Sequence, residues 1–168
     1  MRGIITMVHP KPPSENSDYV IFVDGSWRKP HYGAYAAIIL KDDKEYACLS
    51  APVFNCTINH VELLAIAKAL GSFDKSVKVS VYSDSQYAVN CITRWMYAWL
   101  ANGWMTSLGE PVKNKEVIEE LYHLCRLHEV KVRWVRGHAG NKYNEKCDKI
   151  AQTITKAMVD KIILPPLV

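Results

Sequence analysis

The sequence lacks long hydrophobic runs, and it lacks the cysteine patterns of disulfide-rich and zinc-binding proteins. No apolar run approaches the roughly 20 residues that a membrane-spanning helix needs. The five cysteines are odd in number and widely spaced, without a CxxC pair: Cys48, Cys56, Cys91, Cys125 and Cys147. This pattern favours free thiols in a reducing compartment over a disulfide framework or a zinc site. We therefore expect a cytoplasmic protein that does not enter a membrane.

Internal repeats, low-complexity tracts and linkers are also missing after residue 17, so the 168 residues predict a single domain. Residues 1–17, MRGIITMVHPKPPSENS, hold three prolines and one pair of adjacent isoleucines. This is not the apolar core of a signal peptide, and we predict a disordered leader over 1–17. The folded domain is predicted over 18–160, with a C-terminal tail at 161–168.

The net charge is only +4, and one segment accounts for all of it. Residues 131–149 hold six lysines and arginines against one glutamate and one aspartate, a difference of +4, so the rest of the chain sums to zero. A local basic surface fits a polyanionic partner such as nucleic acid. A solvated helix face explains the same pattern, and charge alone does not separate the two.

The hydrophobic pattern predicts an α/β fold. Strands are expected near 19–24, 34–40, 45–50, 76–84 and 130–135, and helices near 57–71, 85–92, 94–101, 114–127 and 141–159. KDDK at 41–44 is typical of a hairpin turn. Three strands in hairpin order, followed by alternating helices and strands, predict a mixed five-stranded sheet. Its first three strands are antiparallel, and helices cover both faces.

Several carboxylates stand where a purely structural residue is not expected. Asp24 ends the first strand in VIFVDGS, and Asp84 ends the fourth in SVKVSVYSD. If these strands are parallel neighbours, both carboxylates reach one crevice at their carboxyl ends. Glu62 interrupts the apolar helix VELLAIAKAL, and Asp148 lies on the closing helix. The alternative for Asp24 is ordinary turn chemistry, because Asp before Gly commonly ends a strand.

Four converging carboxylates would repel one another and raise their pKa values unless cations neutralise them. Mg²⁺ prefers such oxygen ligands, and it keeps room for water and a substrate phosphate. Two ions about 3.5–4 Å apart can hold the attacking and leaving oxygens of a phosphoryl displacement. Acids beside a basic segment therefore predict a metal-dependent nuclease. His138, in RGHAGNKYNEKCD, titrates near neutral pH and can carry a proton, although a lone histidine is more often structural.

These residues resemble type 1 ribonuclease H. The matching motifs keep the family's order and spacing over about 19–157, and they are FVDGS, NHVELLAIAKAL, YSDSQY and VRGHAGNKYNEKCDKIA. The resemblance implies a ribonuclease H-like fold and an endoribonuclease that hydrolyses the RNA strand of RNA–DNA hybrids, leaving 5′-phosphate and 3′-hydroxyl ends. It also implies a monomer that uses Mg²⁺, with Mn²⁺ as a substitute and two ions when substrate is bound. His138 then becomes the proton shuttle, and the metal ligands are Asp24, Glu62, Asp84 and Asp148.

Eight further residues beside these motifs are predicted to contact the substrate: Gly25, Ser26, Thr57, Asn59, Gln86, Trp95, Trp99 and Trp104. Selection of RNA requires contacts to its 2′-hydroxyl groups, and the candidates for these contacts are backbone groups near Gly25 and Ser26, with Asn59 and Gln86. The tryptophans have two interpretations, a packed core or a surface on which the substrate stacks.

The segment 92–114 resembles the handle region of bacterial members, which is basic. In this chain no charge occurs between Arg94 and Glu110. We therefore expect fewer phosphate contacts from the handle, and a weaker grip on substrate there. Two other functions stay open: a related two-metal nuclease that cuts DNA, and a hybrid-binding module without catalysis. The four acids argue against the module, since binding alone gains nothing from clustering them.

Overall fold

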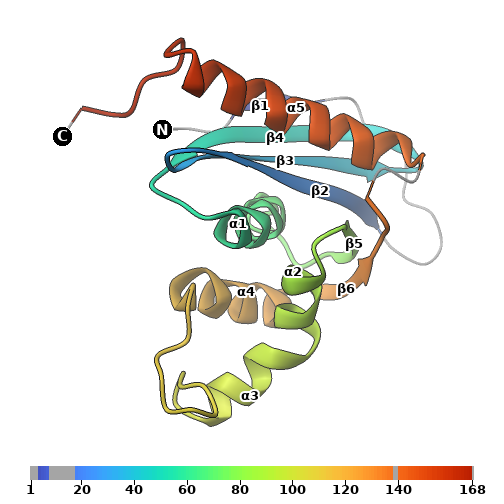
Figure 1. Cartoon of the computed structure of the whole chain (residues 1–168). Coiled ribbons are helices and arrows are strands. Elements are labelled where there is room, and N and C mark those ends of the chain that lie inside the picture. The colour runs from blue at the N-terminus through green and yellow to red at the C-terminus, as the bar shows by residue number, and fades with distance from the viewer. Residues whose placement is uncertain (1–3, 8–17, 138–139, 168) are drawn as a thin grey trace.

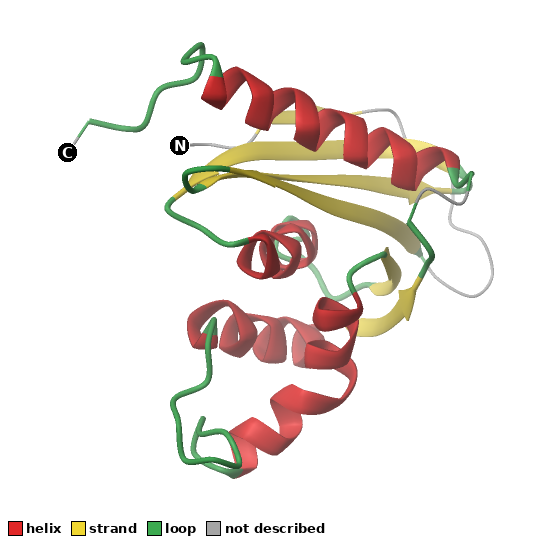
Figure 2. Cartoon of the chain, viewed as in Figure 1, coloured by secondary structure: helices red, strands yellow, loops and turns green. Residues whose placement is uncertain are grey.

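A six-stranded mixed sheet forms the centre of the fold in this computed structural model, which describes residues 4–7, 18–137 and 140–167. Helices cover both faces of the sheet (Figures 1 and 2). The strands are β1 (Ile4–Met7), β2 (Tyr19–Arg28), β3 (Tyr32–Lys41), β4 (Lys44–Phe54), β5 (Lys78–Ser83) and β6 (Glu129–Trp134). The helices are α1 (Ile58–Leu70), α2 (Gln86–Asn90), the π-helical turn η1 (Cys91–Trp95), α3 (Met96–Ala101), α4 (Lys115–Leu127) and α5 (Lys142–Val159).

The strand order is β1-β4-β3-β2-β5-β6. Strands β2, β3 and β4 pair antiparallel, while β5 and β6 continue the sheet in parallel with β2. These are the five strands predicted from the sequence, in the predicted arrangement. The KDDK turn is also confirmed, because Asp42 and Asp43 both have positive φ angles, of 52° and 60°, as a tight two-residue hairpin requires.

The sixth strand, β1, corrects the prediction of a disordered leader at residues 4–7. It pairs antiparallel with β4, from Ile4 opposite Ser50 to Met7 opposite Ala47. The outer edge of β4 offers backbone hydrogen-bonding groups, and a short β-rich segment such as IITM can occupy them. Four residues give too little periodicity for the sequence alone to show this strand. The rest of the predicted leader lies outside the described residues.

The helical run after β5 also differs from expectation. The sequence predicts two helices separated near residue 93, but residues 86–101 form one continuous run. The wider π-helical turn η1 lies in its middle and joins α2 to α3 without a break, with Cys91 and Ile92 buried. Among the described residues, no helix has the length and apolar character needed to cross a membrane.

Two hydrophobic cores lie on opposite faces of the sheet. On β2, Ile21 and Val23 point into the larger core beneath α1 and α4, while Phe22 points into the smaller core beneath α5. Helix α1 packs between the sheet and α4, which explains why it is apolar on most of its surface. Thr57 caps its start by accepting a hydrogen bond from the His60 N–H at 3.2 Å.

Candidate active site

Asp24 and Asp84 lie side by side because their strands are parallel neighbours. Val23 on β2 pairs with Ser83, the last residue of β5, and an aspartate follows each of them. Asp24 does not end its strand as the sequence suggested, because β2 continues to Arg28 in its pairing with β3; Asp24 lies where the parallel pairing with β5 stops. The carboxyl ends of adjacent parallel strands are the usual place for sites in open α/β sheets. The predicted juxtaposition of these two side chains is therefore present in the structure.

Glu62 completes a cluster of three carboxylates. One carboxylate oxygen from each of Asp24, Glu62 and Asp84 lies within 4.8 Å of the others. Asp24 is 4% exposed and Glu62 is 7% exposed, so two of the three acids are withdrawn from water. Such burial is costly unless a partner compensates the charge.

The close approach of Glu62 depends on Gly25. A Cβ atom at Gly25 would lie 3.0 Å from Val61 Cγ1 and 3.2 Å from Glu62 Cδ. The missing side chain thus leaves the space in which α1 brings the Glu62 carboxylate against β2 beside Asp24. This gives the glycine of the FVDGS motif a physical role besides any contact of its backbone with substrate.

Burial dominates the electrostatics of the cluster. It raises the pKa of Asp24 to about 8, with further increases from the negative charges of Asp84 and then Asp148. The Gly25 N–H opposes this shift by donating to Asp24 Oδ1 at 2.8 Å. The pKa of Glu62 is raised well above its usual value, first by burial and then by the charges of Asp24 and Asp84.

A divalent cation fits this set of groups. All three side chains offer hard oxygen donors, the ligand type that Mg²⁺ and Mn²⁺ share. Glu62 Oε2 is buried and has no hydrogen-bond partner among the described residues. A cation would satisfy that oxygen and remove the repulsion that raises the pKa values.

Asp148, the fourth predicted ligand, lies nearby but outside the three-residue cluster. Its charge contributes to the raised pKa of Asp24, which places it within electrostatic range. In the structure its two carboxylate oxygens each accept a hydrogen bond from Gln152 Nε2 at 3.0 Å. The fold therefore brings three of the four predicted ligands together and holds the fourth on the adjoining helix.

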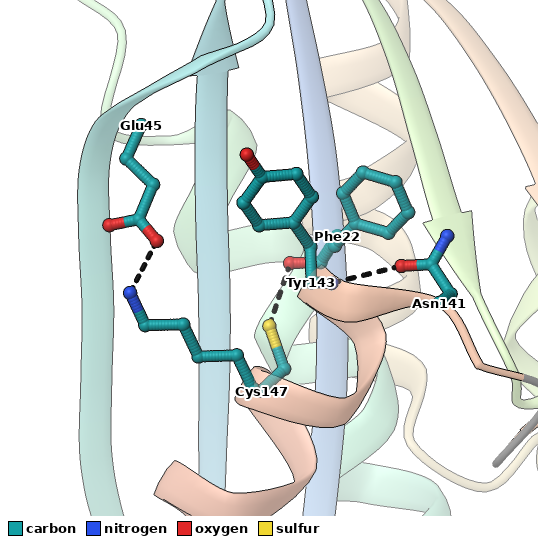
Figure 3. A network of polar contacts seen from close by, with 6 residues as sticks. Phe22, Glu45, Asn141, Tyr143 and Cys147 are labelled. Carbon is teal, nitrogen blue, oxygen red and sulfur yellow. Dashed lines mark hydrogen bonds and ion pairs between the residues drawn. The ribbon is translucent and has the colours of Figure 1, made fainter.

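Helix α5, which carries Asp148, is fixed to the sheet at its first turns (Figure 3). Asn141 caps the helix, because its Oδ1 accepts from the N–H groups of Tyr143 at 3.0 Å and Asn144 at 2.9 Å. The Cys147 thiol donates to the carbonyl oxygen of Phe22 at 3.3 Å, on the same strand as Asp24. Lys146 forms an ion pair with Glu45 on β4. These contacts set the position of the helix beside the carboxylates.

His138 lies outside the described residues, so its predicted role rests on the sequence motif. The segment around it joins β6 to α5, and both elements end or begin beside the cluster. Trp134 at the end of β6 was not singled out from the sequence. Its indole N–H donates to the carbonyl oxygen of Asp84 at 3.0 Å. The signal that could have identified it is its position, a tryptophan near the end of VKVRWV, the strand predicted at 130–135.

Among the predicted substrate contacts with polar side chains, two are exposed and two already form hydrogen bonds within the protein. Asn59 and Gln86 are exposed in the first turns of α1 and α2, the helices that follow β4 and β5. The Thr57 side chain caps α1, and the Ser26 hydroxyl lies 2.9 Å from that of Thr155 on α5. The hydroxyls of Thr57 and Ser26 would have to contact the substrate through their remaining hydrogen-bonding capacity.

The three tryptophans divide between packed and exposed positions. Trp99 and Trp104 pack against the larger core. Trp95 is 36% exposed, and its ring centroid lies 5.9 Å from that of Trp99. One ring is therefore at the surface while the other two support the packing of the handle region.

Comparisons with known proteins agree with this fold. Residues 16–156 match the family model described as RNase H. A protein named Ribonuclease H from Neorickettsia sennetsu is 39% identical over 137 residues, which cover 80% of this chain and 91% of the relative. Ribonuclease HI from Haemophilus influenzae is 38% identical over 133 residues, which cover 79% of this chain and 86% of the relative.

Among solved structures, a foamy viral protease-reverse transcriptase in complex with an RNA/DNA hybrid superposes with a TM-score of 0.76. It is 17% identical, and the match covers 89% of this chain and 22% of the viral chain. At that identity the likeness establishes a shared fold.

Proposed function

The chain belongs to the ribonuclease H family and is a nuclease that hydrolyses phosphodiester bonds, and we propose that it cuts the RNA strand of RNA–DNA hybrids by a two-metal mechanism. The observation that carries this proposal is the cluster of Asp24, Glu62 and Asp84, which forms where the parallel pairing of β2 and β5 ends. The foamy viral protein of the same fold is described in complex with an RNA/DNA hybrid, which supports the substrate class.

The three clustered acids and Asp148 would hold the metal ions. When bound, a pair of Mg²⁺ ions, or Mn²⁺ in their place, supplies the positive charge that stabilises the attacking and leaving oxygens of the displacement. Water attacks the phosphorus, and the bond to the RNA 3′ oxygen breaks. His138 would deliver a proton to that leaving oxygen, so the products carry 5′-phosphate and 3′-hydroxyl ends.

Lysines on α5 support a polyanionic substrate beside this site. Lys142, Lys146 and Lys149 line a hollow on the helix together with Asp148. All three lysines are exposed, although Lys146 also pairs with Glu45. We propose that this surface holds the phosphates of the hybrid, and that the protein acts as a monomer. The cysteine pattern remains the basis for proposing a cytoplasmic location.

The substrate class can be tested with three duplexes of one sequence: an RNA–DNA hybrid, a DNA duplex and an RNA duplex. In Mg²⁺ we expect cleavage of the RNA strand of the hybrid, with little cleavage of the DNA duplex. Faster cleavage of the DNA duplex would support the alternative of a DNA-directed two-metal nuclease. Binding of the hybrid without any cleavage would support a binding module.

Replacement of His138 is expected to slow the reaction without disabling the metal site. His138→Ala should lower kcat by about 10²-fold or less, because water can replace a proton shuttle. Mn²⁺ binding should hardly change, since the side chain is not a predicted ligand. His123→Ala, an exposed histidine on α4, is the matched control and should behave as wild type. Loss of Mn²⁺ binding in His138→Ala would show that the residue is a ligand instead.

The uncharged handle leads to a prediction about salt. Leu100 and Ala101 are exposed at the end of α3, and replacing both by lysine adds two charges to a region that has none. If both lysines meet phosphates, the fall of log K with log salt should steepen by up to about two units, with tighter binding at low salt. The measurement is a salt titration of hybrid binding in Ca²⁺, in which we expect little cleavage.

The control for the handle places the same charges elsewhere. Ile162→Lys with Leu164→Lys adds two lysines to the C-terminal tail, where both residues are well exposed. In Figure 1 the tail lies at the opposite end of the molecule from α3. We expect the tail variant to keep the wild-type slope. If the handle variant also keeps it, α3 does not face the substrate.

A further inference from the structure

The end of β6 and the residue after it hold the main chain at Ser83 and Asp84. Trp134 Nε1–H donates to the carbonyl oxygen of Asp84 at 3.0 Å, and the Val135 N–H donates to the carbonyl oxygen of Ser83 at 2.9 Å. These bonds fix the main chain at the end of β5. They thus set the backbone position from which the Asp84 side chain extends.

Gly137 stands against the carboxylate of the same residue. A Cβ atom at Gly137 would lie 2.8 Å from Asp84 Oδ2, closer than real Cβ contacts allow. The next two nearest atoms are also in the Asp84 side chain, Cβ and Cγ, each at 3.6 Å. The side chain that a methyl group at this position would meet first is therefore that of Asp84.

The backbone conformation does not explain this glycine. Gly103, Gly109 and Gly140 have positive φ angles, which side chains rarely adopt, but Gly137 does not. An alanine at 137 would therefore meet no conformational penalty of the left-handed kind. What the position requires is empty space beside a carboxylate.

We propose that Gly137 is a positioning residue for Asp84, because the space it leaves allows the Asp84 carboxylate to lie beside those of Asp24 and Glu62. Trp134 supports the same arrangement by holding the main chain at Asp84. The inference rests on the proposed function, because it assumes that the clustered acids bind metal. A side chain at 137 would rotate the carboxylate, the flexible end of the contact, out of the cluster. Stability would change little, while the metal site would lose a correctly placed oxygen.

Gly137→Ala tests this with two readings, one of them independent of activity. The affinity for Mn²⁺ in the absence of substrate can be measured by electron paramagnetic resonance of the free ion. It should weaken by about 10-fold to 100-fold, as for other residues that orient metal ligands. At fixed Mg²⁺, kcat should fall by about 10²-fold because a ligand is misplaced. The KM for hybrid and the melting temperature in EDTA should stay close to wild type.

Two further variants complete the experiment. Gly71→Ala makes the same chemical change beyond the end of α1, where the nearest atoms are backbone oxygens of Ala67 and Lys68, and it should bind Mn²⁺ like wild type. Trp134→Phe removes the indole N–H and should weaken Mn²⁺ binding several-fold. It supplies an independent reading if Gly137→Ala does not fold.

The outcomes separate this inference from the proposed function. Wild-type Mn²⁺ affinity in a folded Gly137→Ala overturns the inference, as does wild-type affinity in Trp134→Phe when the alanine variant does not fold. If the wild-type protein binds Mn²⁺ and Gly137→Ala binds it weakly, the inference stands even where no hybrid is cleaved. In that case the proposed substrate is what fails.

Discussion

Asp24→Asn should lower the rate of hybrid cleavage by about 10³-fold or more while the protein remains folded. Asparagine keeps the shape of the side chain but removes the charge that a divalent cation needs at the centre of the cluster. A loss of 10³ corresponds to about 4 kcal/mol of transition-state stabilisation, a plausible size for a displaced or missing metal ion. Single-turnover cleavage in Mg²⁺ measures the effect, and far-ultraviolet circular dichroism reports the fold.

The matched control is Asp43→Asn, the same substitution in the turn between β3 and β4. Asp43 has a φ of 60°, a conformation that asparagine also tolerates, so the control should fold and cleave like wild type. If Asp24→Asn retained more than about a tenth of the wild-type rate, its role as a metal ligand would be untenable, because tenfold is only about 1.4 kcal/mol.

The same substitution should raise stability when metal is removed, and increasingly so at high pH. In the folded protein the pKa of Asp24 is about 8, against an ordinary value of 3.8, because the carboxyl is buried beside other acids. Between these values the folded state holds a proton that the unfolded state has lost. The resulting stability is fully present below pH 3.8 and is lost progressively as the pH rises to about 8.

Asp24→Asn has no such proton to lose, so the difference between variant and wild type grows with pH. In EDTA the variant should melt higher than wild type at pH 9, by on the order of 5 °C, if a few kcal/mol of repulsion is relieved. At pH 5 the gain should be smaller. Thermal unfolding at both pH values measures it, with Asp43→Asn as control. An equal or larger gain at pH 5 would contradict the raised pKa of Asp24.

Mg²⁺ should reverse this order of stability. A cation that binds the folded state stabilises it more the more tightly it binds, so the variant, which lacks one ligand, should gain less than wild type. The variant should therefore be the more stable protein in EDTA, and wild type the more stable protein in Mg²⁺.

The sequence predicts the parts of the site that follow from local pattern. Asp24 and Asp84 each follow a run rich in apolar residues, and parallel pairing of the two strands that contain these runs is enough to bring them together. Glu62 is conspicuous because a charged residue interrupts an apolar helix. The hairpin at 41–44 is predictable for the same reason, since its turn chemistry is local.

Other features depend on contacts between distant segments, which local pattern does not contain. Strand β1 exists because the edge of β4 accepts it, not because four residues have a strong propensity. The empty space at Gly137 has meaning only beside Asp84, more than fifty residues earlier in the chain. The hydrogen bonds from Gln152 to Asp148 likewise depend on the side-chain conformations that the folded helix adopts.

The most direct test of the central claim is cleavage of an RNA–DNA hybrid labelled on the RNA strand, by the wild-type protein, in Mg²⁺ and in EDTA, with the product ends mapped. We expect RNA fragments with 5′-phosphate and 3′-hydroxyl ends in Mg²⁺, no cleavage in EDTA, and full recovery when Mg²⁺ is restored. Cleavage that persists in EDTA, or RNA products with 3′-phosphate ends, would contradict a metal-dependent reaction at the three clustered carboxylates.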